Sequence, residues 1–479
     1  MIEDLKPYPQ YKDSGLAWLG KVPAHWGIAR SKRLFRQRKE FAKSDDQQLS
    51  ATQAFGVIPQ ALYEQRTGYR VVKISMHLNK RKHVQADDFV ISMRSFQGGL
   101  ERAWAAGAIR SSYVVLEPGA EVSAGYFQHL FKSHQYINAL RATSDFIRDG
   151  QDLNFGNFCG VDLPLIPLQE QAAIARFLAW ATNRLDRAIG AKRRIIALLQ
   201  EQKQAIIHRA VTRGLDPSVP LKDSGIPWLG EIPEHWDVVR LKTLVSHVTS
   251  GSRGWSNFAA DSGVLFIRIG NLSRASLNLD FNSSVRLQLP LHVLSEATRS
   301  RVQPDDILLS ITAFIGSVAV VSPGMEEAYV SQHVACCRPR VGAANSSWVG
   351  YVLLSNVGQT HGKLSMYGGT KQGLSLDDVR NHLVLLPPRS EQDDLVEWIG
   401  HSTTTLNAGI SNAKHEITLL REYRTRLIAD VVTGKLDVRE MAAGLPEEEL
   451  QDQPDVASGY DADEAEEDAE SDLIDTAED

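Results

Sequence analysis

The sequence predicts an α/β (α+β) protein: two mixed, β-rich domains separated by a pseudo-two-fold antiparallel pair of long coiled-coil helices. Three observations predict this fold class. A short motif occurs twice, a long amphipathic segment occurs twice, and a variable region lies between them in each copy. Internal duplication on this scale determines the architecture of a chain, so the repeats predict more about the fold than any single residue does.

The short motif occupies residues 12–26 (KDSGLAWLGKVPAHW) and recurs at 222–236 (KDSGIPWLGEIPEHW). Ten of the fifteen positions are identical, at a constant offset of 210 residues. We expect its tryptophans to be packing anchors. His25 and His235 recur without other metal-ligand residues nearby, which favours a core contact or a local hydrogen bond over metal ligation.

The long segment runs through 167–216 and again through 387–440, at an offset of 221 residues after a one-residue adjustment. Each copy contains a seam of mainly apolar residues spaced alternately by four and three, without proline, which is typical of a coiled coil. Two ordinary amphipathic helices in separate domains are the alternative. The first seam comprises Leu178, Thr182, Leu185, Ile189, Lys192, Ile196, Leu199, Lys203, Ile206 and Ala210, and the second comprises Ile399, Thr403, Leu406, Ile410, Ala413, Ile417, Leu420, Arg424, Leu427 and Val431.

Three cations interrupt these seams, namely Lys192, Lys203 and Arg424. Long charged side chains bury their aliphatic stems and extend the charge to water, so we expect these three to reach the edge of the helix pair. The alternative is that they fix the register of the two helices, as polar seam residues do in some coiled coils.

The variable regions, 27–166 and 237–386, differ in most residues, but their ends correspond. QADDFVISM (85–93) matches QPDDILLSI (303–311), each an acidic turn that enters a buried strand. LPLIPL and LVLLPP are each a strand closed by proline before the long segment. The runs YRVVKIS, SYVVLEP, VLFIRIG and SVAVVSP are further predicted strands, separated by Gly, Pro, Asp and Asn turns.

These patterns divide the chain into five parts. They are a first domain at 1–166 with its motif at 12–26, a first spacer helix at 167–216, a second domain at 217–386 with its motif at 222–236, a second spacer helix at 387–440, and a disordered acidic tail at 441–479.

Charge is distributed unevenly along the chain. Residues 440–479 contain 17 of the 58 acidic residues and no Lys or Arg, which leaves residues 1–439 with a net charge of +11. A basic body suits a polyanionic partner. For the tail we favour a role in solubility, with mimicry of nucleic acid as the alternative.

Composition also limits the class of protein. Hydrophobic residues make up 43% of the chain and charged residues 23%, as in globular proteins. The longest charge-free apolar stretch, ILLSITAFIGSVAVV (307–321), is shorter than a bilayer span and β-branched, so it predicts buried strands. The polar N-terminus carries no secretory signal, and the three cysteines have neither disulfide nor metal spacing. We therefore expect a cytoplasmic protein.

The order of the elements has a geometric consequence. The first long helix begins at the first domain and ends at the second, so pairing with the second helix must be antiparallel. The duplicated units are then related by a pseudo-two-fold axis, as are the backbones of duplex DNA. At 1.5 Å per residue, the spacer is at most about 50 Å long, or about one and a half turns of DNA.

Together these residues resemble the specificity subunit of type I restriction–modification systems. The resemblance rests on the repeated KDSG-x-x-WLG-x-x-P-x-HW motif, on the strand–Pro–EQ–helix segments, and on the TRGLD and TGKLD ends of the helices. It covers about residues 8–440. It implies two target-recognition domains, each binding one half of a split sequence in double-stranded DNA, and spacer helices that dock two methyltransferase subunits. Motor–nuclease subunits join that complex. S-adenosylmethionine, ATP and Mg²⁺ are expected on the partner subunits and no cofactor on this chain.

Because the two domains differ, we expect a target with two unlike halves. The residues predicted to contact DNA lie in basic or glycine-rich loops. Phosphate contacts are predicted for Arg81, Lys82 and Lys371, and base contacts for Arg94, Gln97, Arg253 and Gln372.

No catalytic or metal-binding motif is present: the chain lacks a phosphate-binding Gly-x-x-x-x-Gly-Lys-Ser/Thr loop, a His-Glu-x-x-His helix and an Asn-Pro-Pro-Tyr site. The paired acids in the two DD turns are interpreted as turn signals. The sequence thus predicts a non-enzymatic DNA-binding scaffold. The alternatives are the same scaffold with a fused methyltransferase–nuclease partner, a self-contained enzyme, or a coiled-coil adaptor that binds no nucleic acid.

Overall fold

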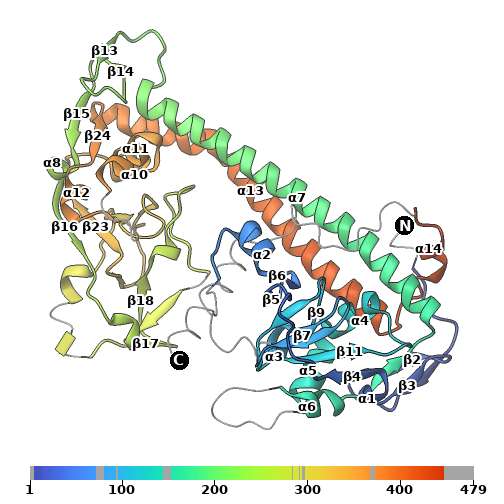
Figure 1. The fold of residues 1–479 in the computed structure, drawn as a ribbon. Helices are drawn as coiled ribbons and strands as arrows, with labels where there is room; N and C mark the ends of the chain where they lie inside the picture. The colour runs from blue at the N-terminus through green and yellow to red at the C-terminus, as the bar shows by residue number, and fades with distance from the viewer. Residues whose placement is uncertain are drawn as a thin grey trace. The chain divides into compact units, whose positions relative to one another are not determined.

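The computed structural model describes residues 5–71, 80–92, 95–143, 153–282, 284–290, 292–293, 297–366 and 373–446. Its contacts divide the chain into two compact units, residues 1–193 with 414–479 and residues 194–413. Each unit contains one variable domain and parts of the two long helices, α7 (Leu168–Arg213) and α13 (Arg389–Val432) (Figure 1). Within the described residues, no helix is long and apolar enough to cross a membrane.

The first unit contains short strands and helices that precede α7, together with α14, which follows α13. Its strands are β1 (Tyr11–Asp13), β2 (Lys21–Pro23), β3 (Gly27–Ala29), β4 (Phe35–Arg38), β5 (Leu49–Thr52), β6 (Gly56–Pro59), β7 (Lys82–Val84), β8 (Phe89–Ile91), β9 (Glu101–Arg102), β10 (Gly107–Ile109), β11 (Val114–Pro118) and β12 (Leu163–Leu165). Its other helices are α1 (Ser31–Leu34), α2 (Gln60–Thr67), α3 (Ser95–Gly98), α4 (Ala124–Phe131), α5 (His134–Arg141), α6 (Phe155–Cys159) and α14 (Arg439–Ala443).

The second unit contains the second copy of the motif and the second variable domain. Its strands are β13 (Leu221–Asp223), β14 (Glu231–Pro233), β15 (Asp237–Arg240), β16 (Val245–Ser250), β17 (Ala259–Ala260), β18 (Val264–Ile267), β19 (Val285–Leu287), β20 (Ile307–Ser310), β21 (Val318–Val320), β22 (Ala328–Val330), β23 (Val334–Pro339) and β24 (Leu383–Leu386). Its helices are α8 (Leu241–Leu244), α10 (Ser346–Leu354), α11 (Asn356–Ser365) and α12 (Leu376–Arg380), with 3₁₀ turns η3 (Trp255–Phe258), η4 (Ile269–Asn271) and η5 (Thr298–Ser300).

The same four-stranded antiparallel sheet forms the centre of each domain. Its strand order is β4-β11-β8-β9 in the first domain and β16-β23-β20-β21 in the second. In both, the strand after the DD turn (β8 or β20) pairs with the strand three places later in the chain (β11 or β23). The predicted strands in SYVVLEP and SVAVVSP are β11 and β21. The divergent sequences therefore form one common frame.

The two DD turns confirm the turn prediction and add a buried ion pair. The first aspartate adopts a left-handed conformation, with φ of 71° at Asp87 and 68° at Asp305. The second is buried and accepts a hydrogen bond from the backbone N–H three residues earlier as well as from an arginine. Asp88 binds Arg38 Nε at 2.8 Å, and Asp306 binds Arg338 Nη2 at 2.7 Å. The arginine lies on β4 in the first domain and on β23 in the second. These strands occupy different places in the two sheets, so the same ion pair is formed by a non-equivalent arginine in each domain.

Outside this sheet the domains diverge. The second domain adds a sheet in the order β17-β19-β18-β22, in which β18 and β22 are parallel. In the corresponding part of the first domain, the described residues form the two-stranded sheets β5-β6 and β10-β7. The predicted strand YRVVKIS is not seen at residues 69–71, and its remainder lies outside the described residues.

The repeated motif is fastened to the start of each long helix through one glutamate. In the first unit, Glu170 accepts hydrogen bonds from Trp26 Nε1 at 2.9 Å and Tyr8 Oη at 2.7 Å, and lies 2.7 Å from His25 Nε2. In the second unit, Glu391 accepts from Trp236 Nε1 at 3.1 Å and lies 2.7 Å from the ring nitrogen of the equivalent histidine. We call this arrangement the Trp–Glu latch.

The glutamine after each latch glutamate fastens the domain in the same way. Gln171 donates to Ile166 O at 2.8 Å and accepts from Ser123 N at 2.8 Å. Gln392 donates to Pro387 O and accepts from Asn345 N, both at 2.8 Å. Each repeated Glu-Gln pair therefore joins motif, strand, domain and helix at one point.

The motif tryptophans that precede the latch pack on the domains, as expected. Trp18 meets Tyr136 edge-on, with ring centroids 5.8 Å apart, and Trp228 meets His361 at 6.3 Å. Deeper in the first domain, Phe35 packs against Phe89, Phe127, Phe131 and Phe158 in one aromatic core.

The long helices run antiparallel within each unit, as expected (Figure 1). In the first unit Arg424 Nη1 binds Asp186 Oδ1 at 2.7 Å, and Lys192 pairs with Glu416. In the second unit Lys203 Nζ donates to Asn407 Oδ1 at 2.6 Å.

The expectation that the seam cations extend to solvent is wrong for Lys203. Only 6% of its surface is exposed, and burial lowers the pKa of its ammonium group. The offset of 221 residues relates Lys203 to Arg424 and Asp186 to Asn407. Each unit thus holds a cation of one helix against a polar side chain of the other, which favours the alternative that these residues fix register.

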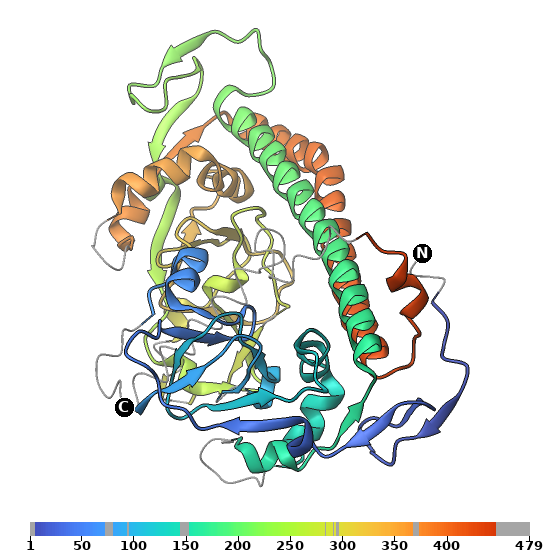
Figure 2. The ribbon, with the colours of Figure 1, turned by 45° about the vertical axis from the view of Figure 1, so that its right-hand side comes forward.

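The C-terminal end of α13 completes the first unit. Asp437 N donates to Lys6 O at 2.8 Å, so the chain after α13 lies beside the N-terminal segment (Figure 2). Tyr126 Oη donates to Val432 O at 2.8 Å, and the guanidinium of Arg439 lies over the Tyr8 ring at 5.0 Å. The first domain is thereby held by segments from both ends of the sequence.

Candidate nucleic-acid interface

The residues predicted to contact phosphate in the first domain are partly buried. Arg81 is 9% exposed, and its Nη1 has no hydrogen-bond partner. Burial and the nearby Arg110 lower the pKa of this guanidinium. An unpaired buried N–H is costly, so an oxygen of an anion would be a favourable partner there. Lys82 is committed locally, because its Nζ donates to Tyr113 O.

The residues predicted to read bases occupy loops. Gln97 is exposed on α3, in the connection between β8 and β9. Arg253 is exposed in the turn before η3, beside Gly254 with φ of 79°. Arg94, Lys371 and Gln372 lie outside the described residues.

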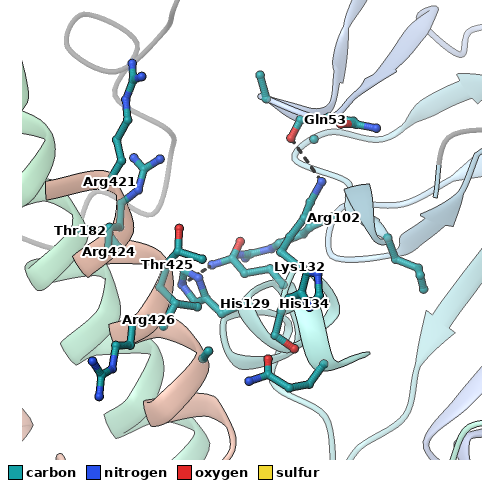
Figure 3. A pocket seen from close by; sticks show the side chains of 18 of the residues that line it. Gln53, Arg102, His129, Lys132, His134, Thr182, Arg421, Arg424, Thr425 and Arg426 are labelled. Atoms are coloured by element: carbon teal, nitrogen blue, oxygen red, sulfur yellow. Dashed lines mark hydrogen bonds between the residues drawn. The ribbon is translucent and has the colours of Figure 1, made fainter. Parts of the chain in front are cut away.

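A cleft of about 1100 Å³ lies inside the first unit, between the domain and the helix pair (Figure 3). One wall belongs to the domain and carries Gln53, Arg102, Trp104, His129, Lys132 and His134. The other wall belongs to the helices and the turn after them, and carries Thr182, Arg421, Arg424, Thr425, Arg426 and Lys435.

The cleft has a basic lining, with six Lys and Arg residues against three acidic ones. Several of these cations are held in place by carboxylates. Lys132 pairs with Glu101, and Arg102 pairs with Asp87 while its guanidinium lies 4.2 Å from the centre of the Trp104 ring. Such fixed cations at a surface are suited to phosphate groups of a nucleic-acid backbone.

A second cavity, of about 930 Å³, lies inside the second unit. Arg274, Lys363, His333 and His382 contribute to its lining, and none of the described residues that line it is acidic. It borders Gly373, the first described residue after the predicted pair Lys371 and Gln372. The described ends of the glycine-rich loop predicted to contact DNA, Met366 and Gly373, therefore line a cavity whose described residues include no carboxylate.

The sequence did not identify the helix wall of the first cleft. Its signal is the basic run REYRTR at 421–426, which a coiled-coil interpretation assigns to a solvated face. Only the packing of α13 beside the first domain places this run opposite Arg102 and Lys132.

The described residues include no group of three His, Cys, Asp or Glu positioned to hold a metal ion. The two motif histidines make the latch contacts described above. These are hydrogen bonds, as one of the two predicted alternatives has it, but they are not local, because each partner lies about 150 residues away in the chain.

Comparisons with known proteins find relatives in the family that the repeated segments resemble. No family model matches the sequence. The chain is 24% identical over 288 residues to the type I restriction enzyme MjaVIII specificity subunit of Methanocaldococcus jannaschii, covering 59% of this chain and 64% of that protein. It is 24% identical over 340 residues to the type I restriction enzyme EcoBI specificity subunit of Escherichia coli, covering 70% of this chain and 68% of that protein.

A solved structure from a study of complex assembly and conformational transition in the type I restriction–modification system has a similar fold. It superimposes with a TM-score of 0.52 at 18% identity, over 87% of this chain and 99% of that one. In sequence and in fold, the chain is thus similar to the specificity subunits of type I restriction enzymes, as its two repeated segments predict.

Proposed function

We propose that this chain is the DNA-specificity subunit of a type I restriction–modification complex and has no catalytic activity of its own. Each domain binds one half of a bipartite, asymmetric target in double-stranded DNA. The observation that carries the proposal is one sheet frame built twice, with unlike loops at equivalent places. A polar α3 with exposed Gln97 connects β8 and β9, whereas an apolar loop connects β20 and β21.

Phosphate contacts are proposed for the fixed cations that line the first cleft and the second cavity. Arg102, Lys132 and Arg421 serve the first half-site, and Lys363 serves the second. Lys371, which lies outside the described residues, is proposed for the second half-site from its place in the sequence alone. Each phosphate contact releases counterions, so replacing one lysine by alanine reduces the salt dependence of binding on every sequence.

The long helices are proposed to dock two methyltransferase subunits, which carry S-adenosylmethionine; motor–nuclease subunits with ATP and Mg²⁺ complete the complex. Supporting this, the offset of 221 residues relates two exposed leucines, Leu198 with 64% of its surface exposed and Leu419 with 48%. Two equivalent apolar contacts on the helices suit two copies of one partner.

A leucine-to-aspartate series tests the docking surface. Leu198→Asp and Leu419→Asp should each leave one methyltransferase bound, and the double variant none, as measured by light scattering after size exclusion. Leu168→Asp is the control, because Leu168 is 48% exposed at the start of the same long helix. Retention of both subunits by the double variant would contradict the assignment.

Modification-sensitive sequencing tests the function itself. DNA from cells that carry the chain with its methyltransferase partner is compared with DNA from cells that lack only this chain. We expect a split, asymmetric motif that loses its methylation when the chain is absent. Unchanged methylation together with no salt-sensitive DNA binding would favour the coiled-coil adaptor instead. A partner that both methylates and cleaves would identify the fused-partner variant.

A further inference from the structure

The loop between β20 and β21 exposes one aromatic side chain at its tip. Phe314 is 55% exposed, whereas Ile311 and Ile315 in the same loop are 7% and 9% exposed. The sequence predicts buried strands across this whole stretch, so its exposure does not follow from the hydrophobic pattern. A single exposed apolar side chain is common at a protein surface, so the case for a ligand depends on how this ring is held and on what surrounds it.

The backbone of the tip is fixed. Ala313 has φ of 51°, a left-handed conformation that persists in a residue other than glycine only when its surroundings enforce it. The carbonyl oxygen of Phe314 accepts hydrogen bonds from Ser317 N at 3.2 Å, from Ser317 Oγ at 3.0 Å and from Ser310 Oγ. The ring is therefore presented from a rigid support.

The next two carbonyl groups are also held by side chains from outside the loop. Ile315 O accepts from Arg274 Nη2 at 2.6 Å, and Gly316 O accepts from Gln359 Nε2 at 2.7 Å. Three consecutive backbone carbonyls thus accept hydrogen bonds, so the backbone of the tip has little freedom to move the ring back onto the domain.

The surroundings of the tip favour a nucleic acid over a protein. The residues on either side of Phe314 in the chain line the second cavity, together with Arg274 and Lys363. Its polar neighbours Thr312 and His333 bind each other at 2.9 Å. Polar and basic groups around one exposed ring suit the anionic, polar surface of a nucleic acid.

Resting on the proposed function, we infer that Phe314 reads the second half-site by packing against the 5-methyl group of a thymine. This methyl is the apolar feature of the major-groove edge, where phenylalanine is one of the side chains that contact it. The equivalent loop of the first domain presents the amide of Gln97, so the two loops read different chemical groups from the same place in the sheet.

The test replaces each thymine of the second half-site, one at a time, by deoxyuridine, which carries hydrogen in place of the methyl group. With the wild-type complex of this chain and its methyltransferase, one replacement should weaken DNA binding roughly tenfold. Phe314→Ala should bind thymine DNA with about the same roughly tenfold loss and should not distinguish deoxyuridine at that position. Phe314→Leu, which keeps an apolar side chain, should keep part of the discrimination.

Phe281→Ala is the matched control, because Phe281 is an exposed phenylalanine of the same unit, 40% accessible, that follows Asp280. It should keep the wild-type discrimination. Undiminished discrimination by Phe314→Ala, a second half-site without thymine, or loss of methyltransferase assembly with intact DNA binding would each overturn the inference. A wild-type complex without any sequence preference would overturn the proposed function as well, which distinguishes the two failures.

Discussion

At the scale of single residues, each Trp–Glu latch explains why the short motif is repeated almost unchanged. Glu170 is 5% exposed and has three side-chain hydrogen-bond partners, whereas Glu391 is 30% exposed and has two such partners in the latch. Most remaining identities in the motif form its turns, as where Asp13 Oδ1 accepts from Gly15 N at 2.8 Å. The motif is therefore kept for its own geometry while the adjoining domain diverges.

Removing the latch carboxylate should loosen one unit at a time. Glu170→Ala leaves buried donors of Trp26 and Tyr8 unpaired, at a cost of about 3 kcal/mol, and Glu391→Ala should cost about 1–2 kcal/mol because it is more accessible. Hydrogen exchange should rise in peptides from the motif of the altered unit alone. Glu170→Gln, whose oxygen can still accept from both donors, should recover most of the protection. Equal loosening of both motifs by either variant would contradict the latch.

Acid should destabilise the second unit through one histidine. His382 is 2% exposed, and burial lowers its pKa to about 4, with His361 as a further unfavourable neighbour. Because the unfolded chain binds a proton near pH 6.5, stability is present above that pH and is lost as pH falls towards 4, by about 3 kcal/mol. Urea unfolding at stepwise pH measures this loss. His382→Gln should flatten the profile, and an unchanged slope in this variant would contradict the assignment.

Single-residue roles could be predicted from the sequence only where a repeat marked them. The repeated histidines were interpreted correctly as hydrogen-bonding groups, and the DD pairs as turns. The latch partner and the exposure of Phe314 could not be predicted, because both depend on which distant backbone lies beside them.

At the scale of elements, the helix pair uses unequal polar contacts at equivalent positions. The first unit opposes Arg424 with a carboxylate, Asp186, whereas the second opposes the more buried Lys203 with the neutral amide of Asn407. A buried cation without a counterion is the less favourable of the two arrangements.

Exchanging these polar groups should therefore have opposite effects in the two units. Asn407→Asp gives Lys203 a carboxylate and should stabilise the second unit by about 1 kcal/mol, whereas Asp186→Asn should cost less than about 1 kcal/mol because Arg424 is 35% exposed. Urea denaturation of each variant measures the change. Destabilisation by Asn407→Asp would show that the position selects against a charge.

Elements with a strong period were predictable, and their polar contacts were not. The 4-3 spacing correctly predicts two antiparallel helices, because periodic burial determines which face is covered. The same spacing cannot show that Lys203 is buried, since a lysine at a seam either extends to water or pairs, depending on the facing residue. The sheet core of each domain was likewise visible, but the source of the arginine in each DD ion pair was not.

At the scale of the whole molecule, the acidic C-terminal segment opposes the basic body. Removing residues 447–479 takes away 16 acidic residues and changes the formal net charge from −6 to +10. Long-range attraction to DNA should then increase, so association should be several-fold faster at low salt and converge with the full chain at high salt. Stopped-flow binding measures both rates. Equal rates at low salt would show that the segment does not affect the encounter with DNA.

The architecture of the whole was the most predictable level, because duplication repeats every element in order. The first cleft was not predictable in this way, since it joins a domain to a basic run of α13 about 290 residues further along the chain. Long-range packing of that kind leaves no local pattern.

The central claim is that each domain determines one half of an asymmetric target. It is tested most directly by sequencing the methylated motif in cells that carry Gln97→Ala or Arg253→Ala in place of the unmodified chain. We expect each variant to relax positions in one half only, and the two variants to affect opposite halves, because their loops belong to different domains. Relaxation of the same half by both variants, or a palindromic motif in the unmodified chain, would contradict the account.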